Sequence, residues 1–161
     1  MLKYVDTKIV FQEIPDEITL AISISGCKIH CPDCHSKYLW DDIGTELTND
    51  EIDKLIQKHK GITCVCFMGG EEEDLYYTLN CIKCNYPNLH LGWYTGGGFP
   101  KDNLSALLDY IKIGPYIAER GGLDNPNTNQ QFYAKGKVLH KMSAYENSFY
   151  NVTNKFWKHG N

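Results

Sequence analysis

The chain has 161 residues, of which 42% are hydrophobic, and its formal net charge at pH 7 is −4. This length and composition predict a single domain, residues 1–161, with a buried core, and they exclude a disordered chain. Because no block of Lys or Arg stands out, we expect no nucleic-acid partner. The start "MLKYVDTKIV" lacks the apolar core of a signal peptide, and no run is long enough to cross a bilayer. We therefore expect a cytoplasmic protein without a membrane partner.

The first strong pattern is a strand followed directly by a cysteine-rich loop. In "EITLAISIS", residues 17–25, apolar side chains alternate with small or polar ones, which is the period of a β-strand. The loop "GCKIHCPDCHSKYLW", residues 26–40, then carries Cys27, Cys31 and Cys34. Cytoplasmic thiols stay reduced and the chain has seven cysteines, an odd number, so these three are more typical of metal ligands than of disulfides.

Helix and strand patterns alternate along the rest of the chain. This alternation predicts right-handed crossovers and a parallel sheet. Four or five strands are too few for a complete eight-stranded barrel of about 250 residues, so the expected fold is α/β, a partial (open) parallel β/α barrel. Its core is expected over residues 15–135, followed by an aromatic-rich tail, residues 136–161. Helices are expected at 48–61, 72–84 and 101–110, further strands at 62–68, 89–95, 110–114 and 136–140, and a long loop at 117–131.

Three sequence features follow predicted strands at their carboxyl ends, where the sites of parallel sheets gather. They are the cysteine loop, the turn Gly69-Gly70-Glu71 after the strand at 62–68, and the glycines after Thr95. We expect them to meet at one edge of the sheet. Cys64 and Cys66, which alternate within a buried strand, are expected to be small core residues. Lys112 either points to this edge of the sheet or, as is commoner for a lysine, is solvated.

Two kinds of metal centre fit the cysteines. Structural zinc takes four ligands, usually as two pairs, and Cys31 and Cys34 could pair with Cys81 and Cys84. These pairs lie much further apart than the roughly 15–20 residues of a zinc ribbon, and Cys27 would have no role. A 4Fe-4S cluster on three thiolates explains Cys27 and leaves one iron free to bind another molecule.

The C-x3-C-x2-C spacing after the first strand, with Gly-Gly-Glu after the second, resembles the radical S-adenosylmethionine (SAM) superfamily. The resemblance implies a fold of the partial-barrel type and one 4Fe-4S cluster ligated by Cys27, Cys31 and Cys34. In that family the free iron binds the amino and carboxylate groups of SAM. An electron delivered through the cluster then cleaves a carbon–sulfur bond and releases methionine and a 5′-deoxyadenosyl radical, so no catalytic side chain is expected beyond the cluster and SAM.

The resemblance also implies that Gly69, Gly70 and Glu71 bind the ammonium group of SAM. Glycines let backbone carbonyls come close to it, and Glu71 adds negative charge. Taken alone, the same residues would make a turn and a favourable helix start. Thr95 and Gly96 are expected to line the pocket.

Asp33, Cys34 and His35 are expected beside the nucleoside of SAM by the same resemblance. The position before the third cysteine is often aromatic in the superfamily and lies against the adenine, but here it is Asp33. It is non-aromatic in the branch of activating proteins of anaerobic ribonucleotide reductase, which "CPDCHSKYLW" and "GPYIAERGGLDNPNTNQQFY" also resemble.

That branch implies an oxidoreductase that generates a glycyl radical on anaerobic ribonucleoside-triphosphate reductase, its protein partner. No second cluster motif appears, so a flavodoxin or ferredoxin is expected to supply the electron. Other small radical SAM enzymes, such as an activase for pyruvate formate-lyase or a deazapurine synthase, stay open as alternatives. From a different class, so does a zinc-binding module.

Overall fold

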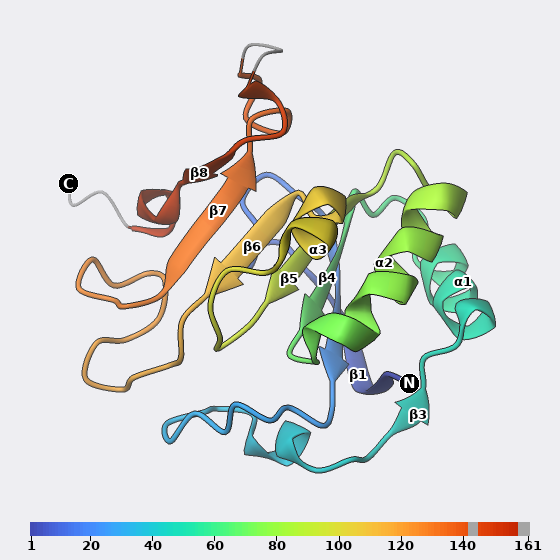
Figure 1. Cartoon of the computed structure of the whole chain (residues 1–161), viewed down its shortest axis with the longest axis horizontal. Helices are drawn as coiled ribbons and strands as arrows, with labels where there is room; N and C mark the ends of the chain where they lie inside the picture. The colour runs from blue at the N-terminus through green and yellow to red at the C-terminus, as the bar shows by residue number, and fades with distance from the viewer. Residues whose placement is uncertain (142–144, 158–161) are drawn as a thin grey trace.

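The computed structural model describes residues 1–141 and 145–157, and its centre is one mixed eight-stranded sheet (Figure 1). The strands lie in the order β3-β1-β2-β4-β5-β6-β7-β8. The four central strands β2, β4, β5 and β6 pair in parallel, as the strand–helix alternation predicts, and the outer strands pair antiparallel. Their bounds are β1 Lys3–Val10, β2 Thr19–Ile24, β3 Thr45–Glu46, β4 Cys64–Met68, β5 His90–Tyr94, β6 Tyr110–Ile113, β7 Gln131–Lys135 and β8 Phe149–Asn151.

The predicted partial parallel β/α barrel is therefore wrong. A parallel strand needs a crossover connection, usually a helix, and the described residues contain three α-helices: α1 (Asn49–Lys58), α2 (Glu72–Asn85) and α3 (Asp102–Leu107). These helices precede β4, β5 and β6, whereas a long loop without a helix joins β6 to β7. Strand β7 returns antiparallel to β6, and β1 runs antiparallel to β2 on the other side. The parallel block is thus bordered on both sides by antiparallel strands.

The strand predicted at residues 136–140 is also wrong, because this segment is a turn after β7. Val138 N donates to the Lys135 carbonyl at 3.2 Å, and Leu139 N donates to the Gly136 carbonyl at 3.1 Å. Val138 and Leu139 pack against a buried cluster on the sheet. These two residues are apolar because they cover the buried cluster, and not because they belong to a β-strand.

The sheet has a different cover on each face. Helix α1 begins as predicted, with the Thr48 hydroxyl accepting from Glu51 N at 3.2 Å, and the helices pack on one face of the sheet (Figure 1). The helix residues in this core are Ile52, Leu55 and Ile56 of α1, Leu75, Leu79 and Ile82 of α2, and Leu104 of α3. The other face buries a second cluster that includes Cys64 and Cys66, which confirms them as core residues.

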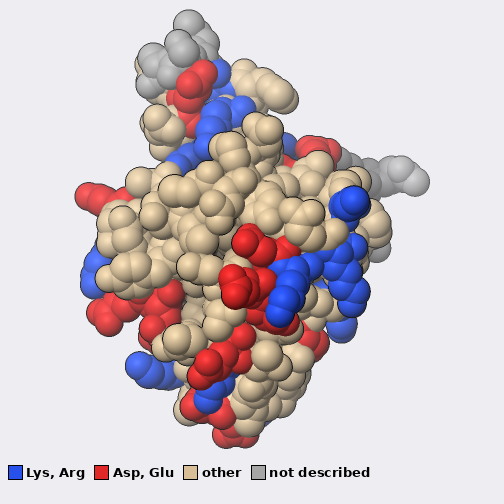
Figure 2. Space-filling view, turned by 90° about the vertical axis from the view of Figure 1, so that its right-hand side faces the viewer, with Lys and Arg blue, Asp and Glu red and all other residues tan. Residues whose placement is uncertain are grey.

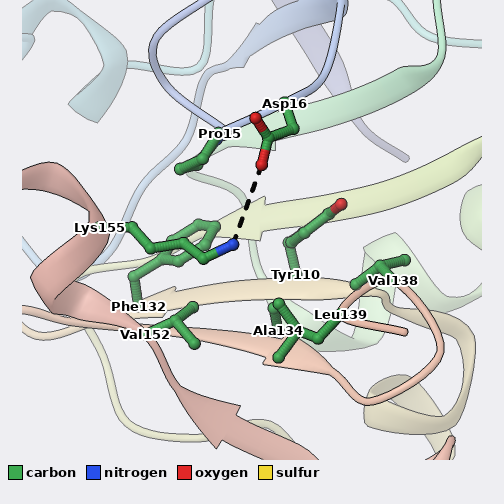
Figure 3. Close-up of a pocket in the computed structure, with 9 residues that line it drawn as sticks. All are labelled: Pro15, Asp16, Tyr110, Phe132, Ala134, Val138, Leu139, Val152 and Lys155. Carbon is green, nitrogen blue, oxygen red and sulfur yellow. Dashed lines mark ion pairs between the residues drawn. The ribbon is translucent and has the colours of Figure 1, made fainter. Parts of the chain in front are cut away.

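Val152 and Phe156 pack on this second face, and Val152 and Lys155 border a small pocket (Figure 3). Phe156 lies edge-on to Phe132 of β7, with ring centroids 4.9 Å apart. Across the pocket, Lys155 Nζ pairs with Asp16 Oδ2 at 3.9 Å. Tyr110, at the amino end of β6, also lines the pocket, so this hollow lies far along the strands from the cysteine loop.

The surface around α1 and α2 carries charges of both signs. Figure 2 shows acidic and basic side chains beside one another on this face and no uniformly basic stripe. Within residues 1–141 and 145–157, none of the helices combines the length and apolar character required to cross a bilayer.

A buried carboxylate ties together the amino ends of the parallel strands. Glu17 accepts hydrogen bonds from Thr63, from Tyr110 Oη at 2.6 Å and from His90 Nδ1 at 2.5 Å. Burial acts to raise the pKa of Glu17, but the hydrogen bonds from His90, Thr63 and Tyr110 outweigh it and hold the pKa below its ordinary value of 4.5. The ionised form is therefore the one that stabilises the fold.

We expect the wild-type chain to lose more stability than Glu17→Gln as the pH falls. A carboxyl group whose pKa is lower in the folded than in the unfolded chain stabilises the fold at pH values above its unfolded pKa. This stability is lost as the pH falls through the pKa of the folded chain. Urea unfolding between about pH 6 and pH 3 should therefore show a steeper loss for the wild type, and at neutral pH Glu17→Gln should cost about 1–3 kcal/mol. Glu46→Gln, an exposed substitution, is the control. Equal pH slopes for wild type and Glu17→Gln would contradict this assignment.

Candidate metal centre

The cysteine loop leaves the carboxyl end of β2 and runs along the edge of the sheet at which β4, β5 and β6 end (Figure 1). Cys27, Cys31 and Cys34 are all partly exposed free thiols. Cys27 N donates to the Leu39 carbonyl at 3.0 Å, and Cys34 N donates to the Cys31 carbonyl at 3.0 Å. The loop thus has its own backbone hydrogen bonds and leaves its thiols accessible.

Stacked rings help to fix the middle of this loop. His30 has a φ of +50°, in the left-handed region that few non-glycine residues adopt. Its ring stacks on Trp40, with centroids 4.5 Å apart and an interplanar angle of 17°. Because His30 lies between Cys27 and Cys31, this stack holds the reverse turn of the chain between the first two thiols.

The Gly69-Gly70-Glu71 turn contacts the cysteine loop, as predicted for one shared edge. Gly69 and Gly70 have φ values of +86° and +85°, which explains the need for glycine. Glu71 then precedes α2, and its Oε1 accepts a hydrogen bond from Lys28 N at 3.2 Å. The Gly69 carbonyl already accepts from Trp93 Nε1 at 2.9 Å, so a ligand ammonium there would share that acceptor.

The segment after β5 contacts the loop as well. A Cβ added at Gly96 would lie 2.8 Å from Cys31 Sγ, closer than real contacts of this kind. Thr95 is buried, and its hydroxyl accepts from Gly97 N at 3.0 Å, which holds the turn. Gly96 therefore borders Cys31 because it has no side chain.

Asp33 and His35 are exposed and join the cysteine loop to the loop after β6. Asp33 Oδ2 accepts from Ala118 N at 2.9 Å, and the His35 ring lies 4.2 Å from the ring of Tyr116. Sequence reasoning missed these two partners. The place of Tyr116 could have been anticipated, because it directly follows Gly114 and Pro115 at the carboxyl end of a predicted parallel strand, where the cysteine loop was also expected.

Lys112 also points to this edge, so of the two arrangements left open for it the solvated one is wrong. Its Nζ donates to the Gly114 carbonyl at 3.0 Å and lies 3.4 Å from the Thr95 carbonyl. Burial lowers the pKa of Lys112 to about 8, and the thiolates of Cys31 and Cys34 act in the opposite direction. The charge of Lys112 therefore interacts electrostatically with two of the three cysteines.

The donor chemistry favours an iron–sulfur cluster over zinc. In residues 1–141 and 145–157, no three His, Cys, Asp or Glu side chains are gathered closely enough to hold a single metal ion. Thiolates are the ligands of iron–sulfur clusters, and three occur on one loop. Cys81 and Cys84, by contrast, lie near the end of α2, where the chain approaches the amino end of β5. The topology therefore separates the two cysteine pairs of the alternative zinc site.

Three accessible thiols on one loop at the carboxyl edge of four parallel strands define an iron–sulfur protein as the class that this site fits best. Residues 18–118, more than half of the chain, match the family described as "4Fe-4S single cluster domain", and the chain belongs to that family. No curated protein matches the sequence. The prediction of a 4Fe-4S cluster is thus confirmed, while SAM binding and the individual ligands stay predictions.

Gly96→Ala is expected to weaken cluster binding. The new Cβ would force Cys31 Sγ to move, and overpacking of this kind costs about 1–3 kcal/mol. Iron retained after reconstitution and gel filtration measures the effect. Gly98→Ala is a matched control, because a Cβ there meets no atom within 4 Å. Equal iron retention in the two variants would contradict the close approach of Gly96 to the bound site.

Proposed function

We propose that the protein is a radical SAM enzyme that generates the glycyl radical of anaerobic ribonucleoside-triphosphate reductase. One observation carries the proposal: the cysteine loop and the Gly69-Gly70-Glu71 turn, two motifs that resemble this superfamily, are in contact. The contact is the hydrogen bond from Lys28 N to Glu71 Oε1 at 3.2 Å. Membership of a 4Fe-4S single cluster family supports the cofactor.

Each of the predicted residues has a role in this proposal. Cys27, Cys31 and Cys34 hold the cluster, which supplies an iron with a free coordination position and the electron for reductive cleavage of SAM. Gly70 and Glu71 would receive the ammonium group of SAM, because the Glu71 carboxylate reaches the cysteine loop at Lys28 N.

The nucleoside half of SAM would lie along the loop after β6. Asp33 is hydrogen-bonded to Ala118 N, so its carboxylate holds the two loops together instead of presenting an aromatic ring. Tyr116, whose ring lies 4.2 Å from that of His35, supplies an aromatic surface in the same region. We propose that the Tyr116–His35 pair takes the place of the aromatic residue that position 33 lacks. Thr95 and Gly96 would line another part of the SAM pocket.

Formation of 5′-deoxyadenosine tests the chemistry. The reconstituted chain is incubated anaerobically with dithionite and SAM, and the products are separated by liquid chromatography. We expect the wild type to form 5′-deoxyadenosine and methionine in a one-to-one ratio. Cys84→Ala should form as much of both products as the wild type, because Cys84 is exposed and lies outside the cysteine loop. No 5′-deoxyadenosine from a protein that holds its cluster would contradict the proposal.

A second experiment tests the partner. Purified anaerobic ribonucleoside-triphosphate reductase is added to the same mixture, with a flavodoxin or ferredoxin as the electron donor in a parallel sample. We expect a glycyl radical signal in the electron paramagnetic resonance spectrum of the reductase. Formation of 5′-deoxyadenosine without this signal would keep the radical SAM chemistry and exclude the reductase as the substrate.

A further inference from the structure

Lys112 is a positively charged side chain at the edge of the sheet along which the cysteine loop runs. It lies on β6, in parallel register with Tyr94 of β5, and the Lys112 carbonyl accepts from Thr95 N at 2.9 Å. The next residue after Thr95 is Gly96, against which Cys31 Sγ packs. Backbone hydrogen bonds of the sheet therefore fix the base of the lysine side chain beside the cysteine loop.

The head group of Lys112 is held in place by carbonyl oxygens alone. Its Nζ donates to the Gly114 carbonyl at 3.0 Å and approaches the Thr95 carbonyl at 3.4 Å. Within the residues that the structure describes, no carboxylate forms an ion pair with it. A partly buried cation without a carboxylate is costly, and the thiolates of Cys31 and Cys34 are the negative groups that act on it.

We propose that Lys112 raises the reduction potential of the 4Fe-4S cluster by placing a positive charge near its thiolate ligand Cys31. Reduction adds one electron, taken from an external one-electron donor, and breaks no bond. A nearby cation stabilises the reduced, more negative cluster more than the oxidised one, and net charge around a cluster is one of the factors that set its potential. The inference rests on the ligation by Cys31 on which the proposed function also depends.

The test is an anaerobic redox titration of the reconstituted full chain, with the reduced cluster followed by electron paramagnetic resonance. Lys112→Gln removes the charge but keeps an N–H donor for the carbonyls, and Lys112→Met is a second neutral variant. We expect the equilibrium constant for reduction to fall about tenfold in both, which is about 59 mV for a one-electron couple. Lys112→Arg, which keeps the charge, should retain a potential close to that of the wild type.

Lys58→Gln is the matched control for removal of one positive charge. Lys58 is exposed and ends α1, at the amino edge of the sheet and away from the cysteine loop, so its substitution should leave the potential unchanged. Neutral variants with the wild-type potential would overturn the inference. So would an equal shift in Lys112→Arg, or loss of the cluster in both neutral variants, because Lys112 would then act on loop structure and not through charge.

The proposed function fails in a distinguishable way. In one outcome the neutral variants have a lower reduction potential than the wild type, but the wild type forms no 5′-deoxyadenosine. This result supports the role of Lys112 and contradicts the radical SAM assignment. A cluster that cleaves SAM but has the same potential in Lys112→Gln and the wild type contradicts only the role of Lys112.

Discussion

Cys31→Ala is expected to abolish the cluster, with the iron content falling from about four atoms per chain to near zero. The three thiolates of the loop are the ligands proposed for the cluster, and with Cys31 replaced only two would remain. Cys31 Sγ also packs against Gly96, and the charge of Lys112 acts on its thiolate. Iron and sulfide analysis after anaerobic reconstitution, together with the visible absorption of the brown protein, measures the loss.

Cys84→Ala controls for the general effect of removing a thiol. Cys84 is exposed on α2, so this variant should keep its full iron content. The pair also separates the two metal hypotheses, because a zinc site would use Cys84 and would give a colourless protein that loses zinc in both variants. Equal iron content in Cys31→Ala and Cys84→Ala would contradict the assignment of Cys31 as a ligand.

Local sequence signals were enough for the central part of the fold. The alternation in residues 17–25, the capping pair Thr48 and Glu51, and the apolar stripe of α2 each depend on neighbours in the sequence, and each appears in the structure. The same holds for the meeting of the Gly69-Gly70-Glu71 turn with the cysteine loop. Parallel strands joined by helices bring their carboxyl ends to one edge, so the order of the motifs was sufficient.

The outer strands could not be predicted in the same way. Strand β1 pairs with β2 and β3, and β7 pairs with β6 and β8, so their place depends on contacts between distant segments. The barrel prediction failed because it took the whole sheet to be parallel and contained neither β1 nor an antiparallel β7. Within the site, the contact from Asp33 to Ala118 spans the whole parallel block. No spacing in the sequence indicates that such a pair will meet.

Asp109 is the buried charge on which the stability of the sheet should depend most. Its side chain is fully buried and accepts from Leu91 N at 2.8 Å, while Oδ2 pairs with Lys83 Nζ at 2.8 Å and Oδ1 with Lys137 Nζ at 2.6 Å. Burial acts to raise the pKa of Asp109, but the bonds from Lys137 and Lys83 outweigh it and hold the pKa below its ordinary value. One carboxylate therefore joins α2, β5 and the turn after β7.

Asp109→Ala is expected to lower the free energy of unfolding by about 3 kcal/mol, because removing one partner of a buried ion pair leaves the other charges uncompensated. The value lies at the lower end of the usual range, since Lys83 and Lys137 are partly exposed and can regain water. Urea unfolding at pH 7 measures it. Asp42→Ala is the control, because Asp42 is exposed and pairs with Lys3 Nζ at 2.9 Å, and it should cost about 0–1 kcal/mol.

The two large effects should separate cleanly. Asp109 directly precedes β6, which carries Lys112 to the opposite edge of the sheet, so it supports the site without contacting it. Asp109→Ala should therefore keep its iron at temperatures where the chain is still folded and lose it only as the chain unfolds. Cys31→Ala should lose its iron while the circular dichroism spectrum of the folded chain is retained. If Asp109→Ala were no less stable than Asp42→Ala, the ion pairs of Asp109 would not hold the sheet together, and its burial would need another explanation.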